Sequence, residues 1–211
     1  MTDDPNNQAQ LDYPGDKAFA EFLERYECPL ALDTVKFRLW GNVVSVAARV
    51  RPTEEFEDIW KRTLPEFEDG DEAGTFFAVM FSLWNALAEL NLDGRRLPLS
   101  QRRGLDSADG LAAMIERRLD EIDRGFTSGF IGDMTFYDKM SERTDNCLSK
   151  LNDLTDKLEE LGEEIENDAT RYPEVRKRFL ALDRTAQRLV DNLVKAANAE
   201  RKFQGRDGGP A

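Results

Sequence analysis

The chain of 211 residues contains no histidine. This absence excludes Ser-His-Asp and Cys-His nucleophilic catalysis, zinc sites with histidine ligands, and the imidazole proton shuttle. An enzyme of this composition would have to use carboxylates, alone or with Mg²⁺ or Mn²⁺, or an unusual lysine or tyrosine base. We therefore predict no catalytic residue, no bound metal and no cofactor.

Cysteine is almost as scarce. Cys28 and Cys147 are far apart in the sequence and match no metal or redox spacing. In a reducing compartment we expect no disulfide between them. Cys147 falls on an apolar helix seam, so we expect it to be a small buried residue and not a nucleophile.

The chain also lacks an excess of positive charge. It has 42 acidic against 29 basic residues, a net charge of −13 and a pI of about 4.6. Binding to nucleic acid or to an anionic membrane needs clustered lysine and arginine. This composition therefore argues against general binding of either kind and leaves room only for a local basic site.

Targeting and membrane segments are not apparent. The first ten residues, MTDDPNNQAQ, are polar and acidic, unlike a signal peptide. The longest apolar run, residues 76–90, is interrupted by Ser82, Asn85 and Glu89 and is shorter than the roughly 20 residues that span a bilayer. We expect a cytoplasmic protein without membrane contact.

Apolar residues recur at helical spacing through most of the sequence, which predicts an all-α fold. The predicted organisation is a disordered tail (1–14), a helical bundle domain (15–125), a hinge (126–133), an antiparallel coiled-coil helical hairpin (134–203, turning near 171–173) and a second disordered tail (204–211).

Within the bundle domain we predict helices at 16–26, 34–48, from Pro52, at 72–90 and at 107–124. Asp33 is the expected N-cap of the second helix and Gly125 the expected C-terminal end of the last. The valines of residues 42–50 leave a strand there as the alternative. The segment 72–90 is the most apolar and is the expected central helix.

The hairpin is predicted from a heptad seam whose steps alternate between three and four residues. The seam stops at Arg171-Tyr172-Pro173 and resumes at Val175. Folding the chain back there keeps both halves in one register, pairing Leu161 with Leu182, Leu158 with Ala186, Leu154 with Leu189, Leu151 with Leu193, Cys147 with Ala196 and Met140 with Phe203.

Charge supports the same pairing. Residues 134–170 carry 11 acids and 4 bases, whereas residues 171–203 carry 4 acids and 9 bases. An acidic helix therefore faces a basic one, with Glu160–Arg184 and Glu164 or Glu166 near 176–178 as expected ion pairs.

A second apolar stripe runs beside the seam and exceeds what a two-helix hairpin can bury. Its members are Leu148, Leu180, Val190, Val194 and Ala197. It could dock onto the N-terminal bundle, or onto a second hairpin in a four-helix homodimer. The sequence leaves both alternatives open.

Two groups of residues are candidates for partner binding. Between Gly94 and Gly104 the chain carries four arginines and no acid, namely Arg95, Arg96, Arg102 and Arg103. Such a loop can clamp phosphate or a partner's acidic patch, or pair with the protein's own acids. The second group lies at the hairpin tip and comprises Arg171, Tyr172, Arg176 and Arg178.

Carboxylate pairs at i, i+3 provide a third candidate. All-α nucleotide pyrophosphatases hold Mg²⁺ with such pairs, and Glu21/Glu24 and Glu55/Asp58 have that spacing. With this many acids, however, chance alone gives roughly eight such pairs.

These observations together favour a non-enzymatic helical adaptor, scaffold or assembly factor that acts through protein–protein contacts. A regulator that binds nucleic acid or nucleotide phosphate through the Arg95–Arg103 loop is the first alternative. A carboxylate- and Mg²⁺-dependent all-α hydrolase is the second.

Overall fold

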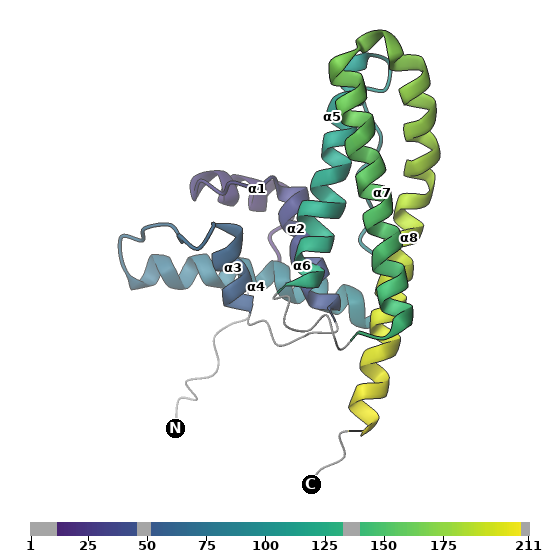
Figure 1. The fold of residues 1–211 in the computed structure, drawn as a ribbon. Helices are drawn as coiled ribbons and strands as arrows, with labels where there is room; N and C mark the ends of the chain where they lie inside the picture. The colour runs from purple at the N-terminus through teal and green to yellow at the C-terminus, as the bar shows by residue number, and fades with distance from the viewer. Residues whose placement is uncertain (1–11, 46–51, 133–139, 208–211) are drawn as a thin grey trace, which may run out of the picture.

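The computed structural model describes residues 12–45, 52–132 and 140–207, with the side chains of the last helix described as far as Arg201. All regular structure in these ranges is helical and none is strand, which confirms the all-α prediction. Helices α5, α7 and α8 stand side by side, and α1 to α4 gather on one side of this group, away from the hairpin tip (Figure 1). The bounds are α1 Asp16–Arg25, α2 Leu32–Val44, α3 Pro52–Ile59, α4 Gly70–Leu92, α5 Ala108–Leu119, η1 Asp120–Thr127, α6 Ser128–Ile131, α7 Glu142–Asn167, η3 Ala169–Arg171 and α8 Tyr172–Asp207.

The predicted hairpin is present. Helices α7 and α8 pack antiparallel around the short 3₁₀ turn η3. Buried seam residues come from both helices and include Leu151, Leu154, Leu158, Leu161, Val175, Phe179, Ala186 and Leu193. Near the open end, the buried Thr144 hydroxyl donates to a carboxylate oxygen of Glu200 at 2.6 Å, as the predicted register requires.

One of the predicted ion pairs across the hairpin forms. Arg178 Nη1 lies 2.7 Å from Glu164, and Arg171 Nη2 reaches the other oxygen of the same carboxylate at 2.9 Å. Glu160 and Arg184 are exposed and form no ion pair in the described part of the chain. Because exposed pairs contribute only about 0.2–1 kcal/mol each, the apolar seam dominates the hairpin's stability.

The second stripe of the hairpin lies against other parts of the same chain. Leu148, Val190 and Ala197 are at most 1% exposed, and Leu180 and Val194 are half-buried against the core. Helix α5 packs on both α7 and α8, and α2 and η1 also reach the hairpin. The structure therefore has the arrangement of the first alternative, in which the stripe docks onto the N-terminal helices.

Helix α2, and not the segment 72–90, is the central helix. Almost every residue from Thr34 to Val44 is buried, and α2 contacts α1, α3, α4, α6, η1 and α8. Helix α4 buries one face, centred on Phe76, Met80, Leu83 and Leu87. The expectation of an all-round buried α4 was wrong because the neighbouring helices crowd around the shorter α2 instead.

Helix α4 is also longer than the apolar run suggested. Its 23 residues make it long and apolar enough to cross a membrane by length and composition, and 28% of its most apolar window is buried. Core helices of soluble proteins pass the same test of length and composition.

Close approach of backbones explains why α2 is so deeply buried. A Cβ at Gly41 of α2 would lie 2.1 Å from the carbonyl oxygen of Phe126, and one at Gly129 of α6 would lie 1.9 Å from the carbonyl oxygen of Arg38. Helices can cross at such short range only where the side chain is a hydrogen atom.

The expected helix end at Gly125 and the hinge from 126 were therefore wrong. The helix continues through the π-helical η1 and α6 as far as Ile131, and Phe126 and Phe130 are buried. Gly125 serves packing: a Cβ there would lie 2.9 Å from Cβ of Phe37. The end comes at Gly132, whose φ is +51°.

Other predicted boundaries shift by a few residues. Ala31, not Asp33, is the N-cap of α2, and Asp33 forms an ion pair with Arg117. Residues 42–44 are helical and Ser45 is the C-cap of α2, whereas the rest of the alternative strand, 46–50, lies outside the described residues. Helix α8 extends beyond residue 204 to Asp207.

The glycine crossing gives a direct stability test. We expect Gly41→Ala and Gly129→Ala each to lower the free energy of unfolding by about 1–3 kcal/mol, because the new methyl group meets backbone atoms that cannot move aside. Gly162→Ala in α7 is the matched control, since its Cβ would lie at an ordinary 3.6 Å from Ile115. That variant should be more stable by about 0.4–1 kcal/mol. Urea unfolding measures all three, and equal effects would contradict the packing argument.

Candidate functional site

The arginine-bearing segment is not a free loop. Residues 94–105, here called the strap, connect α4 to α5 and run along α8 in the opposite direction. The contacts in order are Arg96 with Asp191 at 3.2 Å, the Leu99 N–H with Gln187 Oε1 at 2.7 Å, Arg102 Nε with Asp183 at 2.5 Å, and Arg176 Nε with the Leu105 carbonyl oxygen at 2.8 Å. The strap thus follows α8 for four turns.

A buried ion-pair network anchors the middle of the strap. Arg118 of α5 donates from Nε to Asp183 at 2.6 Å and from Nη1 to Glu121. The three side chains are 0–3% exposed. Arg118 Nη2 also donates to the Ser100 carbonyl oxygen at 2.9 Å, and the Ser100 N–H donates to Glu121 at 2.9 Å. One arginine therefore joins α5, η1, α8 and the strap.

The four arginines predicted to bind a partner divide into different roles. Arg102 bonds to the buried Asp183 and belongs to the network. Arg103 is exposed and has no hydrogen bond or ion pair with any described residue. Arg95 and Arg96 have side chains that are 62% and 68% exposed, and both line a cleft.

The residues of the hairpin tip bond to other parts of the same chain. The Tyr172 hydroxyl donates to the Leu105 carbonyl oxygen at 2.7 Å, next to Arg176. Arg171 and Arg178 both reach Glu164. The sequence placed these four on a contact surface, whereas in the structure each of them has a partner within the chain.

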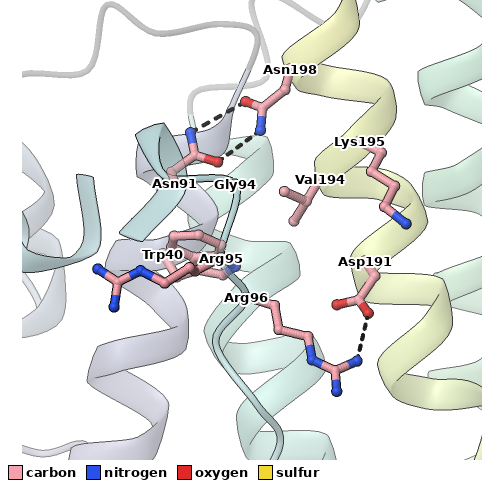
Figure 2. A pocket seen from close by; sticks show the side chains of 9 residues that line it. All are labelled: Trp40, Asn91, Gly94, Arg95, Arg96, Asp191, Val194, Lys195 and Asn198. Carbon is pink, nitrogen blue, oxygen red and sulfur yellow. Dashed lines mark hydrogen bonds and ion pairs between the residues drawn. The ribbon is translucent and has the colours of Figure 1, made fainter. Parts of the chain in front are cut away.

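The cleft lies between the start of the strap and α8 and has a volume of about 580 Å³. At one end Asn91 and Asn198 exchange amide hydrogen bonds at 2.7 and 3.3 Å, and at the other end Arg96 meets Asp191 (Figure 2). Its lining consists of Trp40, Asn91, Gly94, Arg95, Arg96, Asp191, Val194, Lys195 and Asn198.

The chemistry of this cleft is cationic and partly apolar. Arg95, Arg96 and Lys195 line it with three positive charges, of which Arg95 pairs with Asp93 at 2.9 Å and Arg96 with Asp191 at 3.2 Å. Val194 points from α8 into the space, and Trp40 lies opposite the helix (Figure 2). Guanidinium groups beside a small apolar surface suit a carboxylate-bearing peptide or a phosphate.

An apolar stripe on α4 leads to the rim of the cleft. Phe77, Phe81, Trp84 and Ala88 recur every three or four residues and are only partly buried. Leu92, at the end of this line and next to the cleft residue Asn91, is 85% exposed. Phe81 and Trp84 pack on one side against Phe56 of α3, with ring centroids 5.2 and 6.4 Å apart. We call the five residues from Phe77 to Leu92 the α4 stripe.

The carboxylate pairs do not converge on a metal site. Glu55 is 2% exposed and accepts from Arg38 and Asn42, while Asp58 pairs with Arg62. Burial raises the pKa of Glu55, against the opposing influence of Arg38. Glu21 and Glu24 are exposed on α1, and the described residues include no cluster of three or more His, Cys, Asp or Glu side chains suited to a metal.

Neither cysteine is bonded to the other. Both are free thiols and both are half-buried, so Cys147 is less deeply buried than the seam predicted. Burial raises the pKa of Cys28 to about 11, and its thiol is therefore protonated at neutral pH.

Most residues that line the cleft were not predicted from the sequence. Asn91 and Asn198 are separated by 107 positions, and Trp40 lies on a third segment. Asparagine and lysine at these positions look like ordinary exposed helix residues. Only the four arginines and the lack of acids between Gly94 and Gly104 pointed to this part of the chain.

The strap offers a matched pair of variants. Arg102→Ser should lower the free energy of unfolding by about 1.5 kcal/mol, because a charged hydrogen bond to a buried acid is lost at a half-exposed site. Arg103→Ser should stay within about 0.5 kcal/mol of the wild type, since its side chain has no partner among the described residues. Thermal and urea unfolding compare the stability of the two variants. Equal losses of stability would mean that the Arg102–Asp183 ion pair does not stabilise the fold.

No protein-family model, curated protein or solved structure matches this chain.

Proposed function

We propose that this chain is a non-enzymatic cytoplasmic adaptor or assembly factor that acts through protein–protein contacts. The observation that carries the proposal is the position of the α4 stripe, which ends at Leu92 on the rim of the cationic cleft. A partly buried apolar line that ends at the exposed Leu92, beside a cationic cleft, suits an amphipathic helix with an acidic end.

Energetic considerations support a protein partner over chemistry on a small molecule. Apolar side chains that are in contact with water in the free chain stabilise a complex when a protein partner covers them. Lys195 has no ion-pair partner among the described residues, and Arg95 is paired only with the exposed Asp93. Both can set the partner's orientation, because arginine and lysine at a rim tune specificity and association rate. The anchors would be Leu92 and Trp84, and the cleft would receive a carboxylate.

Binding of a nucleotide phosphate or of nucleic acid is the second candidate. It is favoured by one observation, the three cations that line the same cleft. In a chain of net charge −13, such binding would be weak and strongly salt-dependent. A gel shift or nucleotide titration at low and moderate salt tests it.

The partner contact can be tested with variants that leave the fold intact. We expect Leu92→Asp and Arg95→Glu to abolish capture of the proteins retained by the wild-type chain from its native cell extract. The reason is that both side chains are largely exposed and sit on the proposed surface. Affinity capture read by mass spectrometry measures the loss, and circular dichroism melting should remain within a few degrees of the wild type.

Arg103→Glu is the control, because it changes the same charge on the strap but lies outside the cleft. It should capture the same proteins as the wild type. If Leu92→Asp and Arg95→Glu also capture the same set, the proposed surface is not the site of contact.

A further inference from the structure

We infer that the outer face of α8 binds the phosphate backbone of a duplex nucleic acid without reading its sequence. This face, here called the α8 ridge, is separate from the α4 stripe and shares only Lys195 with the cleft. Its members are exposed and follow one another every three or four residues along the helix, namely Lys177, Ala181, Arg184, Arg188, Asn192 and Lys195.

The four cations of the α8 ridge have no counter-charge within the described part of the chain. None of them forms a hydrogen bond or an ion pair with any described residue, and the ridge itself includes no acid. The sequence predicted that the acids of α7 neutralise the basic residues that follow the turn. Among the described residues, however, only Arg171 and Arg178 pair with an acid of α7.

The orientation of the two helices explains why these charges stay unpaired. At about 100° per residue, the ridge lies on the opposite side of α8 from the buried seam residues Phe179, Ala186 and Leu193. Exposed acids of α7 also lie opposite its seam, namely Asp153, Asp156, Glu160 and Glu163. Two helices, each about 10 Å across, separate the two charged faces. This distance exceeds the Debye length of about 8 Å at physiological salt, so these acids offset little of the positive potential at the ridge.

The composition of the ridge identifies the class of anion. Its two uncharged members are Ala181 and Asn192, so it presents no aromatic and no large apolar side chain. A protein partner needs an interface core that is depleted in charge, a membrane surface needs an apolar face that inserts, and a single strand is held by aromatic stacking. The phosphates of a duplex require only cations.

The length of the ridge suits a duplex backbone. Lys177 and Lys195 are 18 positions apart, which corresponds to about 27 Å at the helical rise of about 1.5 Å per residue. A duplex of about eight base pairs has this length. If each of the four cations neutralises one phosphate, log K should fall with log salt with a slope of about −3.6 for duplex DNA. The net charge of −13 opposes the approach of a polyanion, so binding should be weak at physiological salt and measurable at low salt.

Fluorescence anisotropy tests the inference with the full-length chain and labelled duplexes of DNA and of RNA, each of about 24 base pairs, between about 50 and 200 mM KCl. The wild type should bind both duplexes, and a preference for one would identify the source of the phosphates. Its affinity for duplex DNA should fall roughly 100-fold over this range. Arg184→Gln combined with Arg188→Gln should weaken binding at least about tenfold at the lowest salt and make the slope shallower by about two.

Lys150→Gln combined with Lys157→Gln is the matched control, because it removes two exposed and unpaired cations from α7 instead. It should bind like the wild type. Circular dichroism should show that both double variants are folded, since all four side chains are exposed.

Several results would overturn the inference. These are a wild type that binds neither duplex at low salt, an affinity that does not depend on salt, or equal losses in the two double variants. Polyglutamate bound as tightly as the duplexes would assign the ridge to an acidic protein. Sedimentation with phosphatidylserine vesicles that is lost in the Arg184 and Arg188 variant would assign it to a membrane surface. Capture of a cellular protein through Leu92 and Arg95 does not involve the ridge, so each of these results would leave the proposed function standing.

Discussion

The ion pairs of Arg118 are the interaction on which this structure depends. Two acids, Asp183 from the hairpin and Glu121 from η1, are taken out of water and face the same guanidinium. Removing one partner from such a buried group leaves an uncompensated charge, which costs several times more than losing an exposed ion pair. Arg118 also donates to the hydroxyl and the carbonyl oxygen of Ser100, so the strap, and with it the cleft, is positioned by the same residue.

The second constraint is the close crossing of α2 with η1 and α6. Gly41 and Gly129 bring these backbones together, and helices α3 and α4 are left at the periphery. A long apolar helix then keeps part of its apolar face in contact with water. The α4 stripe is therefore a consequence of how the core is built.

Patterns that act over short range predicted much of the fold. The heptad seam and the opposite charges of its two halves predicted the hairpin, and the Thr144–Glu200 contact agrees with the register. Glycine was harder to interpret, because Gly125 has the local signature of a helix end and its packing role depends on Phe37 in a distant segment. The four arginines between Gly94 and Gly104 identified the strap but not its partners. Asp183 lies 81 positions from Arg102 and Asp191 lies 95 positions from Arg96, both in a helix that is basic overall. The cleft was unpredictable for the same reason, since Trp40, Asn91 and Asn198 meet only after folding.

Replacement of Arg118 by Met, followed by urea unfolding and amide hydrogen exchange, tests most directly whether this network unites the molecule. The free energy of unfolding should fall by about 3–5 kcal/mol, and the Leu99 and Ser100 amides should lose their protection. Arg117→Gln, on the neighbouring position of α5, removes a more exposed pair and should cost at most about 1 kcal/mol. An Arg118→Met protein as stable as the Arg117→Gln protein, with a protected strap, would contradict the account.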